Sequence, residues 1–282
     1  MNEHDASFRI IADLLASRTG QQLTESRRWR VSTALSGLFR ELGIENIDQL
    51  ACMLERPGEF RLATRVTEAL LNNETYFFRD YAYFDAVANE VLPRLIDMRQ
   101  DVRKLRIWSA GCSTGQEVLT LAMIVAARRA SLEGWDIEIL GTDVSGKAIA
   151  QAKRACYSQF EIQRGISVTQ MISCFEETAE GWQAVDDIRR FNRFEQHSIL
   201  DFPPSPGRFD LVLCRNVLLY FDTPTRTRAF ERLAQATASD GWLMLGSGET
   251  VVGQSTRFEP APFGASLYCL TDSKSSAARN AA

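Results

Sequence analysis

Short apolar segments alternate with longer segments of helical periodicity between residues 105 and 245, and this alternation constrains the fold more than any other feature of the chain. Strands separated by helices form a mostly parallel sheet with helices on both faces. The expected strands cover residues 105–110, 137–141, 209–214 and 242–245, and the expected helices cover residues 116–130, 145–155 and 223–238. We therefore predict an α/β fold with a doubly wound, mostly parallel sheet.

Two segments interrupt this alternation. Residues 162–193 show no clean strand–helix–strand signal and hold Gly181-Trp182, which predicts an inserted helix and a small antiparallel hairpin with its turn at this pair. Residues 258–270 favour a second hairpin that closes one sheet edge.

The amino-terminal quarter of the chain has a different pattern. Its apolar residues recur at helical spacing, and Gly20, Gly43 and Pro57-Gly58 divide it into four short helices. We expect an all-α domain over residues 1–71, a linker helix over 72–98, the α/β domain over 99–270 and a disordered polar tail over 271–282.

Composition excludes several classes of protein. The net charge of −4 and pI near 5.4 argue against a nucleic-acid-binding protein. The six cysteines are scattered and the only histidines are His4 and His197, so no metal site is expected. No apolar run approaches the roughly 20 residues of a membrane span, and the start lacks the pattern of a signal peptide. We expect a cytoplasmic monomer without membrane insertion.

A basic stretch lies within this acidic chain. Between Arg18 and Arg40 stand Arg27, Arg28 and Arg30, with Glu25 as the one acidic residue. The stretch is either a docking surface for an acidic partner or a solvated helix face.

A glycine loop follows the first expected strand. Gly111-Cys-Ser-Thr-Gly115 joins that strand to a helix, which is the layout of a nucleotide-type site at the carboxyl end of a strand. The loop is neither a Walker A loop nor the dinucleotide fingerprint. Alone, it could be a tight turn without a ligand.

The ends of two other strands carry polar residues suited to the same ligand. Asp143 can accept both hydroxyls of an adenosine ribose, because Ser145 is available to cap the following helix. The strand at 209–214 ends in Cys214-Arg215-Asn216, with Tyr220 close behind, and polar groups there face the ligand crevice.

A further cluster, Asn72-Asn-Glu-Thr-Tyr-Phe-Phe-Arg-Asp80, precedes the sheet. As a plain helix junction it would use Thr75 as a cap and bury its aromatic residues. That interpretation gives no role to Asn73 and Arg79.

Taken together, these segments resemble the CheR-type chemotaxis protein methyltransferases. The likeness covers about residues 8–270 and rests on the Asn-x-Thr-x-Phe-Phe-Arg segment, the Gly-Cys-Ser-Thr-Gly loop, the strand-end Asp143 and the segment from Phe209 to Phe221. It implies the Rossmann-like fold of methyltransferases that use S-adenosylmethionine (SAM). It also implies methyl transfer from SAM to glutamate side chains on the cytoplasmic helices of chemoreceptors, giving γ-methyl esters and S-adenosylhomocysteine.

The resemblance also assigns roles to residues. Asn73, Thr75 and Arg79 match the segment that contacts SAM, Glu117 the second glutamate after the glycine loop, and Arg215-Asn216 the cofactor-contacting strand end. Arg79 and Tyr220 match residues that position the substrate carboxylate, and they are the predicted catalytic pair. The predicted cofactor-binding set is Asn73, Thr75, Arg79, Gly111, Glu117, Asp143, Ser198, Ile199, Cys214, Arg215 and Asn216.

The chain departs from the family pattern at several positions. Gln116 replaces the first glutamate after the loop, Ser198 stands where an asparagine near the adenine is common, and Gly246-Ser-Gly-Glu249 replaces Gly-His-Ser-Glu. The hairpin within 176–193 is also shorter than in members that bind a receptor's carboxy-terminal pentapeptide, which predicts that this tether is not used.

Two other readings stay open at this point. One is a SAM enzyme that acts on a small molecule or nucleic acid. The other is a degenerate, non-catalytic module that binds SAM or receptor.

Overall fold

The computed structural model describes residues 3–24, 27–264 and 266–271. The chain divides into two compact units, Met1–Asn72 with Tyr220–Thr225, and Asn73–Leu219 with Arg226–Ala282. No helix of the described part is long and apolar enough to cross a membrane.

The smaller unit is helical, as predicted, and contains α1 (Glu3–Thr19), α2 (Arg28–Leu42), α3 (Ile47–Leu54) and α4 (Phe60–Leu70). Its buried core includes Phe8, Ile11, Val31, Leu35, Leu50 and Val66. Gly43 ends α2 in the left-handed conformation, and the Asn46 side chain caps α3 by accepting from the Gln49 N–H.

A second chain segment completes this unit. The N–H of Gln22 donates to the carbonyl oxygen of Tyr220 at 2.7 Å, and Gln21 forms a β-bridge with Phe221. The helical unit is therefore built from two stretches that are far apart in the sequence.

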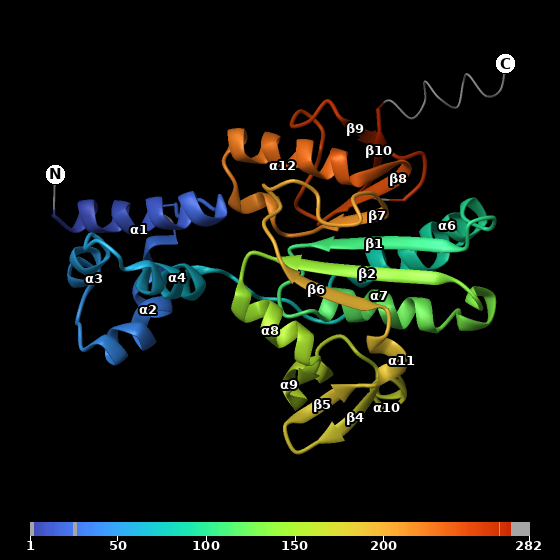
Figure 1. Cartoon of the computed structure of the whole chain (residues 1–282), viewed down its shortest axis with the longest axis horizontal. Coiled ribbons are helices and arrows are strands. Elements are labelled where there is room, and N and C mark those ends of the chain that lie inside the picture. Colours follow the sequence, from blue (N-terminus) through green and yellow to red (C-terminus); the bar gives the residue numbers. More distant parts are fainter. Residues whose placement is uncertain (1–2, 25–26, 265, 272–282) are drawn as a thin grey trace. The chain divides into compact units, whose positions relative to one another are not determined.

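The larger unit contains a seven-stranded sheet in the order β6-β2-β1-β7-β8-β10-β9 (Figure 1). The first five strands are parallel to their neighbours, whereas β10 pairs antiparallel with β8 and β9. The strands are β1 (Lys104–Ala110), β2 (Asp136–Asp143), β6 (Asn192–Gln196), β7 (Phe209–Cys214), β8 (Thr237–Leu245), β9 (Phe258–Pro260) and β10 (Leu267–Leu270). This topology confirms the predicted doubly wound, mostly parallel fold with a hairpin at one edge.

Helices surround this sheet. Both α7 and α8 pack against β2, and α8 also packs against β6. A π-helical turn, η2, interrupts the helical stretch that leads into β1. The bounds are α5 (Tyr81–Ala86), η2 (Val87–Val91), α6 (Leu92–Met98), α7 (Gln116–Ala126), η3 (Arg129–Leu132), α8 (Gly146–Arg154), η4 (Leu218–Tyr220) and α12 (Thr223–Ala236).

The sequence did not reveal strand β6. Its residues Asn-Arg-Phe-Glu-Gln are mostly polar, and only Phe194 among them is buried. An edge strand with one buried side chain carries too little apolar periodicity to be recognised.

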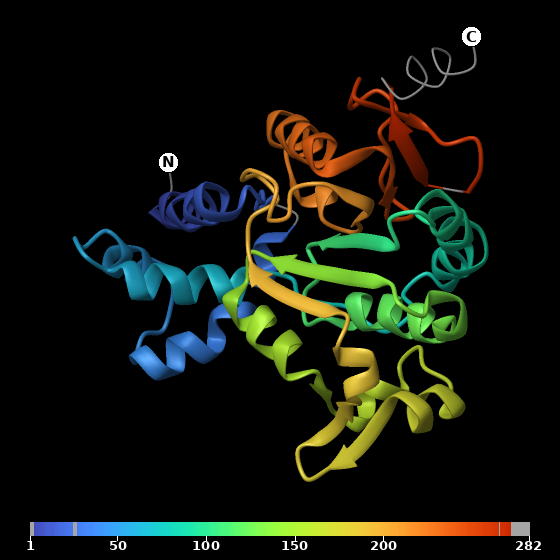
Figure 2. The same ribbon diagram turned by 45° about the vertical axis from the view of Figure 1, so that its right-hand side comes forward.

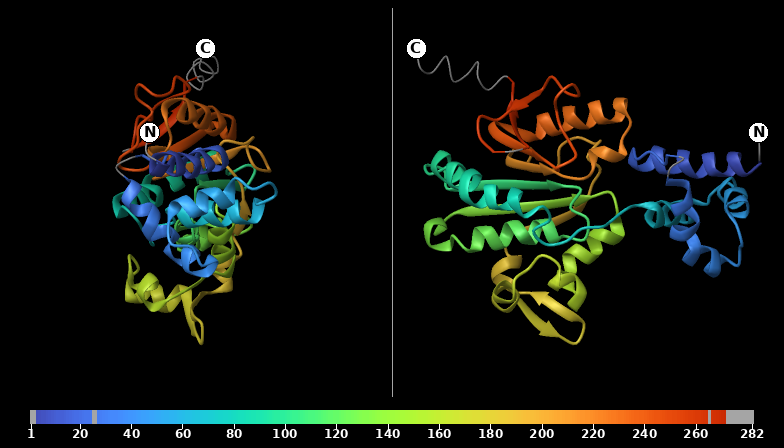
Figure 3. Two further views of the ribbon diagram at one scale, coloured as in Figure 1. Left: turned by 90° about the vertical axis from the view of Figure 1, so that its left-hand side faces the viewer. Right: turned by 180° about the vertical axis from the view of Figure 1, so that it is seen from behind.

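The insertion forms a second, three-stranded sheet in the order β3-β5-β4. Figures 1, 2 and 3 agree that it lies beyond the β6 side of the main sheet, while the hairpin of β9 and β10 lies toward the opposite side. Its elements are β3 (Cys156–Tyr157), α9 (Gln159–Gln163), α10 (Val168–Cys174), β4 (Phe175–Thr178), β5 (Gly181–Ala184) and α11 (Asp186–Arg189).

The hairpin turn lies at residues 179–180, two positions before the predicted one, because Gly181 already belongs to β5. A Cβ at Gly181 would lie 2.5 Å from the carbonyl oxygen of Tyr157. This glycine therefore serves the close approach of β3 rather than the turn. The predicted tail lies, apart from Thr271, outside the described residues.

Phe77 joins the insertion to the segment that precedes α5. Its ring meets the rings of Tyr157 and Phe175 edge-on, with centroids 5.1 and 5.5 Å apart. The backbone of Gly165 passes so close that an added Cβ would lie 1.8 Å from the Phe77 carbonyl oxygen. The conformation of residues 73–80 therefore depends on the packing of the insertion.

This contact predicts a large cost for Gly165→Ala. Gly165 has φ +98°, so the variant combines backbone strain with a steric clash, and we expect it to lose about 3 kcal/mol or more of unfolding free energy. Gly207→Ala is the matched control, because Gly207 has φ +107° and no heavy atom within 4 Å of the added Cβ. Urea denaturation should show about 1–2 kcal/mol for the control. Equal losses would contradict the close-contact explanation.

Candidate active site

The parallel strands of the larger unit end at one edge of the sheet. Ala110 of β1 pairs with Thr142 of β2, and Cys214 of β7 pairs with Leu245 of β8. The polar residues that follow these strands therefore gather at the carboxyl edge, where open α/β sheets bind ligands.

The glycine loop packs closely against the end of β7. Gly111 has φ +84°, and a Cβ there would lie 2.4 Å from a methyl group of Val217. The N–H groups of Gly111 and Cys112 both donate to the Thr142 carbonyl oxygen at 2.8 Å. Only glycine fits this position, and the loop is held by both neighbouring strands.

Asp143 is fixed at the end of β2. One carboxylate oxygen accepts the Ser113 N–H and the other accepts the Ser145 N–H, both at 2.9 Å. The hydroxyl of Ser145 accepts the Ala148 N–H at 3.0 Å, so Ser145 caps α8 as predicted. These bonds fix the orientation of the Asp143 carboxylate at the edge of the sheet.

The segment from Asn73 to Asp80 borders the same loop. The Ser113 hydroxyl donates to the Asn73 carbonyl oxygen at 2.7 Å, and the Asn73 side-chain amide donates to the Ser145 hydroxyl at 3.4 Å. Thr75 is half-buried and caps no helix, since α5 begins at Tyr81. Asn73, the loop and Asp143 are therefore joined by hydrogen bonds at the edge of the sheet.

Arg79 lies between two residues in the left-handed conformation, Phe78 (φ 51°) and Asp80 (φ 60°). The Phe78 N–H donates to the Thr120 hydroxyl at 3.1 Å, which anchors the segment to α7. The Arg79 guanidinium is half-buried and donates to the Glu74 carbonyl oxygen at 3.0 Å. Backbone strain on both sides of one side chain is typical of functional segments.

Arg215 forms a buried brace beneath this segment. Its side chain is 1% exposed and donates to Glu117 at 2.8 Å, to Asp80 at 2.9 Å and to the Arg79 carbonyl oxygen at 2.7 Å. Glu117 in turn accepts the Ser109 hydroxyl at 2.8 Å. The brace therefore joins β1, α7, the end of β7 and the Arg79 segment.

Cys214 and Asn216 flank Arg215. Burial raises the pKa of the Cys214 thiol well above its usual value, and the nearby carboxylates of Glu249 and Glu117 raise it further. This thiol is neutral and fully covered. Asn216 is half-buried with φ 59°, and its N–H donates to Glu249, a residue to which the sequence analysis gave no role.

Ser198 and Ile199 follow β6 at the same edge of the sheet. The Ser198 hydroxyl accepts the Leu200 N–H at 3.2 Å, and Ile199 is 8% exposed. Both residues therefore stand on a short turn after the edge strand.

Tyr220 belongs to the smaller unit. Its hydroxyl accepts a hydrogen bond from the side-chain amide of Asn72 at 2.8 Å. The Arg27 guanidinium lies 4.7 Å above its ring. The hydroxyl is held by an acceptor contact, so its own proton is available to donate.

Comparison with known proteins places this site in a family. Residues 73–265 match the family model of the CheR methyltransferase SAM-binding domain. The chain belongs to this family. It is 32% identical to chemotaxis protein methyltransferase 1 of Pseudomonas aeruginosa over 89% of this chain and 92% of that protein. It is 30% identical to the chemotaxis protein methyltransferase Cher2 of Pseudomonas putida over 92% of this chain and 95% of that protein.

The cofactor of this CheR-family protein is SAM, and the described residues fit it. The loop at Gly111 has no space for a side chain, and Asp143 presents an oriented carboxylate beside it. Both features suit a ligand that brings adenosine hydroxyls close to the backbone.

The replacement of the family's glutamate by Gln116 has a structural explanation. Gln116 is 2% exposed, and its side-chain oxygen accepts the Thr114 hydroxyl at 2.8 Å. A neutral amide keeps this acceptor and avoids the desolvation cost of a buried carboxylate.

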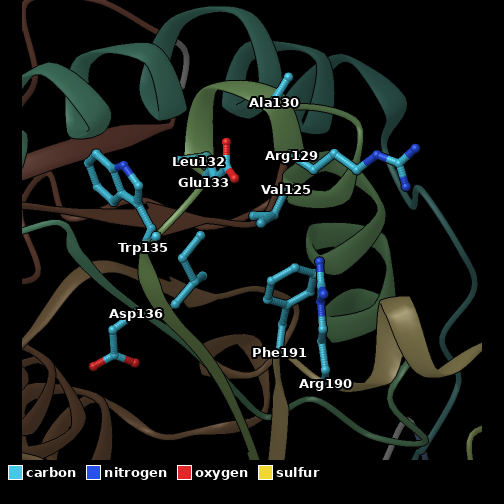
Figure 4. Close-up of a pocket in the computed structure, with 11 residues that line it drawn as sticks. Val125, Arg129, Ala130, Leu132, Glu133, Trp135, Asp136, Arg190 and Phe191 are labelled. Carbon is cyan, nitrogen blue, oxygen red and sulfur yellow. The ribbon is translucent and has the colours of Figure 1, made fainter.

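A hollow of about 580 Å³ lies elsewhere, at the opposite edge of the sheet (Figure 4). Its lining includes Trp135 and Phe191, which stand directly before β2 and β6, together with Arg190, whose guanidinium covers the Phe191 ring. These are the amino ends of parallel strands, so the hollow is separate from the glycine loop.

The Arg215 brace predicts a strong effect of Arg215→Lys. An ammonium group cannot bridge Glu117, Asp80 and the Arg79 carbonyl together, so we expect a loss of about 2–4 kcal/mol in unfolding free energy. The control is Arg129→Lys, because both side chains of its pair with Asp187 are exposed, at 75% and 66%, and such pairs contribute about 1 kcal/mol or less. Denaturation followed by circular dichroism compares the two. Equal losses would contradict the bracing role.

Proposed function

We propose that this protein transfers the methyl group of SAM to glutamate side chains of chemoreceptors, giving γ-methyl esters and S-adenosylhomocysteine. The names of its relatives support an action in chemotaxis. The observation that carries the proposal is the strained, braced segment around Arg79, which offers a guanidinium for a carboxylate substrate. At Asn73 the same segment is hydrogen-bonded to Ser113, whose N–H fixes Asp143.

The reaction requires alignment rather than proton transfer. SAM supplies an electrophilic methyl group on a sulfonium. A glutamate carboxylate is ionised at neutral pH and is already a nucleophile, so one of its oxygens bonds to the methyl carbon as the carbon–sulfur bond breaks. The chain must hold that oxygen in line and exclude the water that solvates it.

Arg79 and Tyr220 suit this work in the proposed mechanism. Each can donate to one carboxylate oxygen and leave the other free to react. The negative charge disappears on transfer, so a strong ionic clamp would stabilise the reactant more than the transition state. We therefore assign orientation to Arg79, whose guanidinium is already fixed by the Glu74 carbonyl, and a hydrogen bond to the Tyr220 hydroxyl.

Cofactor binding is assigned to the carboxyl edge. Asp143 would accept the ribose hydroxyls, with Asn73, Thr75, Gly111, Ser198, Ile199 and Asn216 around the ligand. Arg215 and Cys214 are buried, and both carboxylate oxygens of Glu117 are bound, one to the Ser109 hydroxyl and one to Arg215. We therefore propose that these three residues shape the site rather than contact SAM.

Tyr220→Phe tests the proposed mechanism. Loss of the hydroxyl should lower kcat about 10- to 100-fold, as expected for one orienting hydrogen bond, while the KM for SAM changes little. The assay incubates labelled SAM with chemoreceptor-bearing membranes and measures base-labile methyl groups on the receptor. Tyr268→Phe is the control, because the Tyr268 hydroxyl makes only a 3.5 Å contact with Thr250. Absence of base-labile label with the unmodified protein would overturn the proposed substrate.

The charge of the insertion affects how the protein can recognise a receptor. Strand β4 is one of the two outer strands of the small sheet, and its exposed residues Glu176 and Glu177 make that side acidic. A receptor's carboxyl terminus is itself negative, so the edge would repel it. We propose that substrate recognition does not use the pentapeptide tether.

Calorimetry with a tether pentapeptide bearing a free terminal carboxylate should therefore give no measurable affinity. The double variant Glu176→Lys, Glu177→Lys removes the repulsion and should show weak binding if the edge is otherwise competent. Clear binding to the unmodified protein would overturn tether independence.

The basic stretch supports a role for the smaller unit in recognition. Arg27 lies over the Tyr220 ring, and Arg30 is exposed nearby on α2. Receptor methylation regions rich in glutamate would be attracted to such a surface. We propose a cytoplasmic monomer with chemoreceptor helices as its partner. A degenerate, non-catalytic module is not favoured, because the brace and Asp143 are intact.

A further inference from the structure

Glu249 collects an unusual set of hydrogen bonds at the end of β7. One carboxylate oxygen accepts the N–H groups of Val217, Leu218 and Leu219 at 2.9, 2.8 and 3.3 Å. The other accepts the N–H groups of Asn216 and Gly246 at 2.7 and 3.0 Å. Five backbone donors from two loops therefore converge on one side chain that is 9% exposed.

We infer that Glu249 is a positioning residue for cofactor binding, because it fixes the backbone of residues 216–219. This inference rests on the proposed role of Asn216 beside SAM. The proposed action of Glu249 is on the backbone of residues 216–219 and not on the reacting atoms. This residue acts by holding the loop that presents Asn216.

The convergence of donors requires a carboxylate. Both of its oxygens accept, and an ionised group suits a concave array of N–H dipoles. A glutamine can offer only one oxygen, and its amide group would direct hydrogen atoms at the remaining N–H groups. Whichever way the amide turned, two or three buried donors would lose their partner.

The loop needs this support because its conformation is otherwise unfavourable. Asn216 has φ 59°, in the left-handed region, which asparagine adopts more readily than most L-residues but still less readily than the right-handed region. Gly246 on the opposite side has no space for a side chain, since a Cβ would lie 2.8 Å from the Glu249 carboxylate and 3.0 Å from the Asn216 nitrogen. The two loops are thus packed around the carboxylate, and without it Asn216 could relax to other conformations.

The test compares two buried carboxylates of the same sheet. Glu249→Gln changes the carboxyl edge. Asp210→Asn changes the opposite edge, where Asp210 is 8% exposed and accepts from the Arg99 guanidinium and the Arg106 N–H, both at 2.7 Å. Both variants should be less stable in thermal unfolding, so stability alone does not distinguish them.

Binding of S-adenosylhomocysteine by calorimetry does distinguish them. We expect Glu249→Gln to weaken binding about tenfold or more and to raise the KM for SAM, and Asp210→Asn to stay within about twofold of the unmodified protein. Equal binding by both variants would overturn the inference. Because this readout uses no methyl acceptor, a failure of the proposed glutamate substrate would leave it unaffected.

Hydrogen exchange on the unmodified protein covers the case in which Glu249→Gln does not fold. The amides of Val217, Leu218 and Leu219 should exchange slowly without cofactor, because Glu249 already holds them. Rapid exchange that becomes slow only with S-adenosylhomocysteine would show that the ligand, not Glu249, orders the loop, and would overturn the inference.

Discussion

The larger unit depends on a single buried guanidinium. Arg215 stands at the end of a central strand and binds two carboxylates and a main-chain carbonyl that come from two other parts of the chain, α7 and residues 79–80. Its face also covers the rings of Tyr83 and Phe84, at 5.4 and 5.0 Å from their centroids. A buried charge of this kind is tolerated only where opposite charges and hydrogen-bond acceptors lie close to it. The position of the Arg79 segment is therefore determined by the sheet itself.

The same segment is held from its other side by the insertion. Phe77 stacks edge-on against Tyr157 and Phe175, and Gly165 allows the backbone to touch the Phe77 carbonyl. Ionic contacts thus fix one end of residues 77–80 and aromatic contacts fix the other. The strain at Phe78 and Asp80 persists because both neighbouring surfaces are rigid.

Sequence reasoning recovered the parts of the fold that follow from periodicity and from local capping. The predicted strand at residues 209–214 coincides with β7, and Ser145 caps α8, because both depend on residues that are close together in the chain. Strand β6 escaped recognition because a parallel edge strand is stabilised by its neighbour rather than by its own apolar pattern. Hydrogen bonds through Ser113 connect two of the predicted site residues, Asn73 and Asp143.

The contacts that hold the candidate site in place could not be predicted from the sequence. Arg215 was expected at the cofactor, yet its side chain is enclosed, and no local pattern reports the burial of a charge. In the sequence, Glu249 is only the last residue of a motif that differs from the family pattern. Four of its five donors lie in a loop 30 or more residues away, and the fifth, Gly246, lies in a turn that forms only in the folded chain. Such residues become visible only when distant segments are placed together.

The smaller unit is assembled from two separate stretches of chain, residues 1–72 and 220–225. A fragment that ended before residue 220 would lack both the β-bridge partner of Gln21 and the Tyr220 hydroxyl that Asn72 contacts, so residues 1–72 alone are not the whole of this unit.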